Sequence, residues 1–192
     1  MRLVTSLIIL CLFSCTNLIK NQSSFWETQK GNFKYHSKNQ FVSDSILRAD
    51  YKTLKKFKHP LFDSITGNQV YLYSWQERDK TKNEFTVIND DGELGLKVYY
   101  FILDKKDSLL SWTQIAGKGI EGGYSFETRS KFISNDTILN IGAITQLWDF
   151  DKQKRMEKTK GDTTFSYMTI DSEEKVTEKL FKEVKNLHFE NE

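Results

Sequence analysis

Few side chains in this chain combine a type and a spacing suited to catalysis or metal binding. Asp149 and Asp151 flank Phe150 and would share one face of a strand, where paired carboxylates can bind a cation or transfer protons. Glu121 is a further, isolated carboxylate. Since the spacing does not bring the three acids together, we expect solvated strand ends and predict no catalytic residue.

The histidines and the glycine-rich stretch do not form a recognisable metal or cofactor site. His36, His59 and His188 lie far apart, with no HxH or HExxH pattern, so no metal ligand is predicted. Residues 117–122 have the glycine spacing of the dinucleotide-binding fingerprint, which must open a helix. Residues 124–126 resume a strand pattern instead, so we predict a glycine-rich hairpin loop and no cofactor.

Three tryptophans fall in predicted strands, at Trp75, Trp112 and Trp148. Tryptophan buries a large apolar area, so packing in the core is the first interpretation. The alternative is that these rings face a ligand, as a stacking platform for sugars or as the wall of an apolar cavity.

Five Asp-Ser or Asp-Thr pairs are followed by an apolar residue or by Thr. This pattern is similar to the acceptor motif of periplasmic O-glycosylation in some Gram-negative bacteria. The resemblance implies glycans on Ser45, Ser64, Ser108, Thr137 and Thr163. A structural alternative remains open, because Asp followed by Ser or Thr also starts turns and capped elements.

The first fifteen residues indicate export. Met1-Arg2 precedes an apolar run at residues 3–13, which is too short to span a bilayer. Leu12-Phe13-Ser14-Cys15 resembles the lipobox of bacterial lipoproteins. The resemblance implies that residues 1–14 are removed as a signal peptide, that Cys15 receives a diacylglyceryl thioether, and that its new amino group is acylated. The alternatives are an ordinary secretory signal or an uncleaved anchor.

Lipid on Cys15 would make the membrane the first partner of this protein. Two or three acyl chains hold a protein lastingly on a bilayer, whereas one holds it only marginally. Thr16 stands where an Asp retains lipoproteins at the inner membrane in some bacteria, which favours the outer membrane. Because Cys11 lies in the signal, Cys15 is the only cysteine of the mature chain, and no intramolecular disulfide is expected.

Composition narrows the class of protein. The formal net charge of +2 lacks the basic excess of a nucleic-acid-binding protein, so no nucleic-acid partner is predicted. A local group of lysines at Lys52, Lys55, Lys56 and Lys58 is either a solvated face or a contact with anionic lipid headgroups. Aromatic residues make up 14% of the chain and proline occurs once, which favours β structure.

We predict three parts: the signal peptide at 1–14, a polar lipidated tether at 15–32, and a single β-rich domain at 33–192. Phe25 and Trp26 interrupt the tether. They either dip into the membrane interface or pack on the domain.

Two segments of the domain have the apolar spacing of amphipathic helices. Residues 43–58 form the first, with a stripe at Leu47, Tyr51, Leu54 and Phe57. The second follows a cap at Asp171, with a stripe at Val176, Leu180, Phe181, Val184 and Leu187.

The alternation between these helices predicts eight strands, at residues 70–75, 84–88, 96–103, 109–116, 124–133, 137–148, about 154–158 and 164–170. Their connections are short enough only for antiparallel neighbours, which predicts a meander. Residues 96–103 are apolar on both faces, as in a central strand covered from two sides. The fold class is therefore α+β, a mostly antiparallel β-meander flanked by an N-terminal and a C-terminal helix. The alternative is an eight-stranded barrel with a C-terminal helix.

These features favour a non-enzymatic envelope lipoprotein that binds an apolar small molecule or an envelope protein through a curved sheet. The alternative is a hydrolase of envelope glycans or lipids that uses the dispersed carboxylates Glu121, Asp149 and Asp151.

Overall fold

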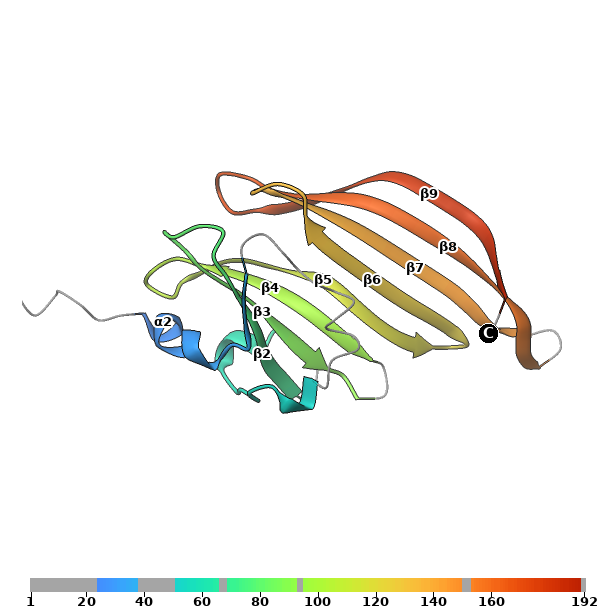
Figure 1. Ribbon diagram of the computed structural model, residues 1–192, viewed down its shortest axis with the longest axis horizontal. Coiled ribbons are helices and arrows are strands. Elements are labelled where there is room, and N and C mark those ends of the chain that lie inside the picture. Colours follow the sequence, from blue (N-terminus) through green and yellow to red (C-terminus); the bar gives the residue numbers. More distant parts are fainter. Residues whose placement is uncertain (1–23, 38–50, 66–68, 93–94, 150–152, 191–192) are drawn as a thin grey trace, which may run out of the picture.

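The computed structural model describes residues 24–37, 51–65, 69–92, 95–149 and 153–190. Nine strands form a single sheet whose spatial order equals the order along the chain (Figure 1). The strands are β1 (Tyr35–Ser37), β2 (Gln69–Gln76), β3 (Asn83–Asp90), β4 (Leu96–Leu103), β5 (Leu109–Glu121), β6 (Tyr124–Phe132), β7 (Thr137–Asp149), β8 (Lys154–Ile170) and β9 (Val176–Glu190). The helical elements are α2 (Phe25–Gln29) and the 3-10 turns η1 (Lys30–Asn32), η2 (Tyr51–Thr53) and η3 (Pro60–Phe62).

The predicted β-rich, mainly antiparallel sheet is confirmed. Every neighbouring pair from β2 to β9 is antiparallel, and only β1 pairs with β2 in parallel. Within the part of the chain that the structure describes, β1 and β9 are the two edges, so the sheet is open and the barrel alternative is wrong.

The predicted C-terminal helix is wrong, because this segment is strand β9. It pairs with β8 over most of its length, from Ile170 opposite Val176 to Lys158 opposite Glu190. The spacing of its apolar residues is compatible with a helix, but β8 offers a long row of unpaired backbone groups. Pairing with that row satisfies the backbone of both segments.

The two strands predicted around residues 154–170 are one strand, β8. The connection between them, Lys160-Gly161-Asp162, continues the strand, with Gly161 opposite Thr145 on one side and Leu187 on the other. The pairing with β9 shifts between Gly161 and Thr163, so the glycine marks a bulge.

The predicted N-terminal helix is also wrong over its described part. Only η2 is helical, and residues 43–50 lie outside the described residues. Lys56 forms a bridge with Tyr71, and the N–H of Phe57 donates to the carbonyl of Val70 at 2.9 Å. This extended segment places Leu54 and Phe57 in two different apolar clusters, which one helical stripe could not do.

Among the described residues, two apolar clusters make up the core. The cap cluster lies under α2, η1 and η3, and includes Trp26, Phe33, Phe62, Phe85 and Phe101. Trp26 is 1% exposed, so residues 24–32, assigned to the tether from the sequence, begin the packed structure. Residues 15–23 lie outside the described residues.

The second cluster, the inner cluster, joins both halves of the sheet. It includes Tyr73 on β2, Tyr100 on β4, Ile138 on β7 and Met168 on β8. Neighbouring strands lie about 4.8 Å apart, so a flat sheet would hold β2 and β8 far from each other. Arg78, just after β2, nevertheless donates to Glu174 in the β8–β9 turn at 2.9 Å, so the sheet curls and brings its two halves together. Alternate residues of β4 enter the two clusters, which confirms the prediction of a central strand covered on both faces.

Candidate functional site

The structure separates the three tryptophans. Trp75 is buried at 4% exposure and belongs to the cap cluster. It starts a row of stacked rings that runs across β2 to β5 through Phe85 and Phe101 to Trp112, with centroids 6.2, 5.7 and 6.3 Å apart. Trp112 is 40% exposed at the end of this row. Trp148 is half exposed near the end of β7 and takes no part in the row. The three rings therefore do not line one site.

The structure does not assemble the predicted carboxylates into a catalytic group. Glu121 is exposed beside the β5–β6 turn, Asp149 ends β7 opposite Lys154, and Asp151 lies outside the described residues. His36, His59 and His188 belong to different parts of the fold, at β1, before η3 and in β9. Among the described residues, no three His, Cys, Asp or Glu side chains are placed to hold a metal ion.

The glycine-rich stretch is mostly strand, and its loop is shorter than predicted. β5 continues to Glu121, which pairs with Tyr124. Gly122 and Gly123 form the whole turn, with φ of +55° and +83°. Two consecutive residues with positive φ are typical of a tight hairpin turn, which glycine adopts without strain.

The five Asp-Ser and Asp-Thr positions differ in accessibility. Ser64 and Ser108 are exposed in connections, whereas Thr137 and Thr163 are half-buried in β7 and β8. Ser45 lies outside the described residues. Glycosylation remains a prediction, and Ser64 and Ser108 are the positions that a modifying enzyme could reach most easily.

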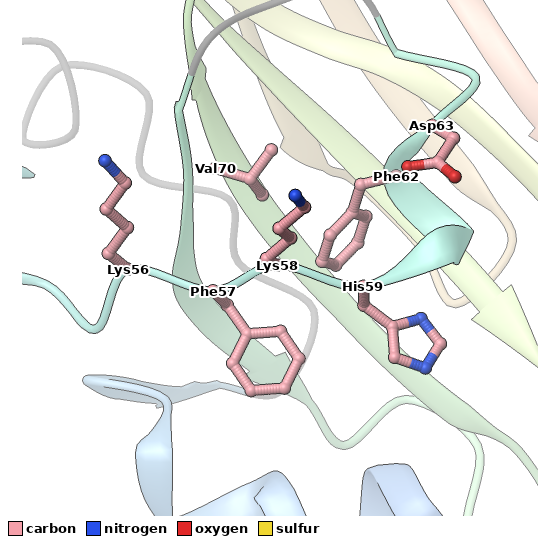
Figure 2. A pocket seen from close by; sticks show the side chains of 7 residues that line it. All are labelled: Lys56, Phe57, Lys58, His59, Phe62, Asp63 and Val70. Carbon is pink, nitrogen blue, oxygen red and sulfur yellow. The ribbon is translucent and has the colours of Figure 1, made fainter.

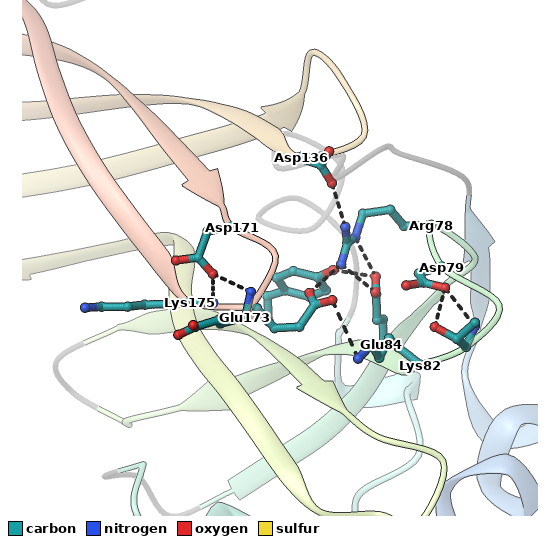
Figure 3. Close-up of polar contacts among 11 residues, drawn as sticks. Arg78, Asp79, Lys82, Glu84, Asp136, Asp171, Glu173 and Lys175 are labelled. Carbon is teal, nitrogen blue, oxygen red and sulfur yellow. Dashed lines mark hydrogen bonds and ion pairs between the residues drawn. The ribbon is translucent and has the colours of Figure 1, made fainter.

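A buried charge cluster, which the sequence did not indicate, lies where three turns meet (Figure 3). Arg78, between β2 and β3, donates from Nε and Nη2 to the two carboxylate oxygens of Glu84, at 3.0 and 2.7 Å. It also donates to Glu174 in the β8–β9 turn and to Asp136 in the β6–β7 turn, each at 2.9 Å. The hydroxyl of Tyr100 donates to Glu84 at 2.5 Å.

The electrostatics of this cluster reflect its burial. The Glu84 side chain is fully buried, and desolvation raises its pKa even though hydrogen bonds from Arg78 and Tyr100 act in the opposite direction. Burial and the nearby Glu84 raise the pKa of Tyr100. A carboxylate and a phenol so enclosed have no access to a substrate. The cluster instead ties three turns together and holds the curl of the sheet.

A polar row crosses the inner side of β6 to β9, beyond the apolar inner cluster. Ser130 and Asn140 are buried and bonded at 3.0 Å, and the amide of Asn140 donates to Glu178 at 3.0 Å. Ser166 donates to the same Glu178 oxygen. Each polar group has a partner, so this row joins strands and does not form an open binding site.

Apolar and aromatic side chains, some half-buried and some exposed, lie on the opposite side of β6 to β9. We call this surface the outer face. It comprises Leu139, Ile141, Ala143, Phe165, Tyr167 and Phe181, which cross-strand pairing and ring contacts place together. Tyr167 and Phe181 stack with centroids 4.3 Å apart and are 37% and 47% exposed. Figure 1 shows that α2 and the 3-10 turns lie beside β2 to β4, away from β6 to β9.

Basic residues border this apolar surface. Arg129 and Lys131 pair with Ile141 and Leu139 from β6, and Lys179 pairs with Tyr167 from β9. Lys182 places its Nζ 5.3 Å from the centre of the Phe165 ring. An apolar centre with a polar border is the usual composition of a surface that binds another protein.

Two open depressions lie on the segment before β2. Lys56, Phe57, Lys58, His59, Phe62, Asp63 and Val70 line one of about 590 Å³ (Figure 2). Gly31, Asn32, Lys34, Thr53, Leu54, Lys55 and Lys56 line the other, of about 740 Å³. Burial lowers the pKa of His59, while Asp107 and Asp63 act against this shift.

No helix among the described residues is long and apolar enough to cross a bilayer. Comparison of the chain with protein-family models, with curated proteins and with solved structures finds no match.

Proposed function

We propose that this protein is a lipid-anchored, non-enzymatic binding protein of the cell envelope, held in the membrane by lipid on Cys15. The outer membrane is the favoured location. Its domain binds a partner protein of the envelope through the outer face of β6 to β9. The observation that carries the proposal is the stacked, half-exposed pair Tyr167 and Phe181 on an apolar surface bordered by lysines.

The geometry favours a protein partner over an apolar small molecule. A carrier of small molecules needs an enclosed space lined by apolar side chains. Where the inner cluster lies, the side of the sheet enclosed by the curl is filled by the protein's own residues: Tyr100, Ile102, Ile115 and Ile138 are each 0% exposed. The outer face is open and extended, which suits the surface of another protein.

The hydrolase alternative has less support. Glu121 is exposed beside a turn. Glu84, whose pKa burial raises, is bonded to Arg78 and has no contact with solvent. Loss of a measurable activity in a Glu121→Gln or Asp149→Asn variant would favour the enzyme.

The anchor is tested by the intact mass of protein extracted from the membranes of a bacterial host that processes lipoproteins. We expect a chain that begins at Cys15 and carries the added mass of a diacylglyceryl group and an acyl chain. Cys15→Ser should remove this mass and release the protein from the membrane. A wild-type chain without lipid would contradict the anchor.

The binding surface is tested by photo-crosslinking in envelope extracts. A photoreactive phenylalanine analogue at Phe181 should give a discrete crosslinked product, whereas the same analogue at Tyr35, an aromatic position of similar exposure on β1, should not. Truncating both Tyr167 and Phe181 to Ala should weaken binding of the captured partner by about 30-fold or more, as at an aromatic hot spot. Equal crosslinking at both positions would rule out the outer face as the specific site.

A further inference from the structure

The chain is nearly neutral, but its positive and negative charges are unevenly distributed along the sequence. Residues 24–65 contain eight Lys and Arg residues and four Asp and Glu residues, a net charge of +4. Residues 66–192 contain 18 basic and 22 acidic residues, a net charge of −4. The excess of positive charge is therefore concentrated in the part of the domain closest in sequence to Cys15.

Four exposed lysines of this segment, which we call the lysine face, gather around the two depressions described above. Lys34, Lys55 and Lys56 line the larger depression. Lys56 and Lys58 line the smaller one, so Lys56 belongs to both linings. Of the described residues that line the two depressions, Asp63 is the one acidic residue. Among the described residues, none of the four lysines forms an ion pair, although Lys34 lies over the ring of Tyr35 at 5.3 Å.

The backbone that carries the lysine face is attached firmly to the sheet. Leu54 is buried in the inner cluster, and Phe57 packs against the cap cluster. Between them, the N–H of Leu72 donates to the carbonyl of Lys55 at 2.9 Å, and Lys56 bridges Tyr71. The lysines therefore project from a fixed platform.

The position of this platform along the chain keeps it close to the membrane if Cys15 is lipidated. Ser24, which caps α2, is nine residues after Cys15. A fully extended chain of this length spans at most about 30 Å. In Figure 1, α2 and the 3-10 turns lie on the side of the molecule opposite to β9.

We propose that the lysine face, Lys34, Lys55, Lys56 and Lys58, docks on the anionic phospholipid headgroups of the membrane that holds the anchor. The docked domain then presents β6 to β9 away from the bilayer, where the outer face can meet a partner. This inference rests on the proposed anchor, because the lipid supplies the proximity that makes a weak contact effective.

Electrostatics gives the expected affinity of the lysine face for an anionic membrane. A lysine near an anionic surface contributes about fivefold in affinity, and the attraction fades within the Debye length, about 10 Å at 0.1 M salt. Four lysines alone should give only weak partitioning, on the order of millimolar lipid. The contact would therefore orient an anchored protein without replacing the anchor.

The test uses the mature chain from residue 15 with Cys15→Ser, so that no lipid contributes to binding. Co-sedimentation is measured with vesicles of phosphatidylcholine alone and with vesicles containing about 30 mol % phosphatidylglycerol. We expect binding to the anionic vesicles only, and loss of that binding at about 0.5 M salt.

Replacement of the four lysines with Gln should reduce vesicle binding by tenfold or more. The matched control replaces four exposed lysines outside both surfaces, Lys80, Lys106, Lys160 and Lys175, with Gln and should bind like the parent. Thermal unfolding verifies that both variants fold. Equal losses in the two variants, or no preference of the parent for anionic vesicles, would overturn the proposal. Neither result bears on the anchor or the outer face, which the intact mass and the crosslinking test separately.

Discussion

Arg78 is the residue on which the buried charge cluster depends, since it bonds carboxylates from three separate parts of the chain. Arg78→Met should lower the free energy of unfolding by about 3–5 kcal/mol, because it leaves Glu84 buried without its cation. Adding Glu84→Gln should restore part of this loss, because the unpaired charge is removed. Urea unfolding of both variants measures the difference. A double variant less stable than Arg78→Met would mean that the charge of Glu84 is not the cause.

His59 should make stability depend on pH. Its Nδ1 accepts a hydrogen bond from the N–H of Leu61, and burial lowers its pKa below the ordinary value of 6.5. The folded protein therefore binds the proton more weakly than the unfolded chain. The contribution of His59 to stability is complete above pH 6.5 and is lost as the pH falls through that value toward the lower pKa of the folded state.

A His59→Asn variant isolates this effect, because Asn can supply a capping oxygen that does not titrate in this range. As the pH falls from above to below the ordinary histidine value of 6.5, the wild-type free energy of unfolding should fall more than that of the variant. Denaturant titrations across this range make the comparison. Parallel pH profiles would show that His59 does not titrate differently on folding.

At the scale of elements, the start of β4 depends on Gly95. Its φ is +122°, and a Cβ at this position would lie 2.1 Å from the backbone oxygen of Lys118 on β5. Gly95→Ala should therefore destabilise the protein by about 2–4 kcal/mol, because the new methyl group would force the paired backbone of β4 or β5 to shift. Gly31→Ala, where a Cβ meets nothing within 4 Å, is the control and should be nearly neutral. Similar melting temperatures for the two variants would refute this account.

The elements also differ in how well the sequence predicted them. Leu96–Leu103 was predicted with its observed limits because its apolar residues serve two clusters at once. The segment at β9 was mispredicted because its apolar residues suit a helix as well as a strand. Whether this segment forms a helix or a strand depends on its pairing with the free edge of β8. The spacing of apolar residues within the segment does not reveal that pairing.

At the scale of the whole molecule, Trp26 fastens the N-terminal segment onto the sheet. It contacts the rings of Phe57, Phe62 and Phe85, with the Phe85 centroid at 4.4 Å. Trp26→Ala should cost about 3–5 kcal/mol, because it leaves a cavity in the cap cluster. Trp112→Ala, at a ring that is 40% exposed, should cost clearly less. Chemical denaturation of the two variants compares them, and the reverse order would contradict the role of Trp26.

The sequence alone determined the antiparallel meander and the two-faced central strand, because alternation and short turns are local properties of the chain. It indicated three of the four lysines of the lysine face, Lys55, Lys56 and Lys58, and it carries the resemblance to a lipobox. Only the tertiary structure decided that β9 is a strand, that Arg78, Glu84 and Glu174 meet, and that Tyr167 and Phe181 stack on an exposed face. These features depend on the curl and register of the sheet, which join residues as many as 96 positions apart.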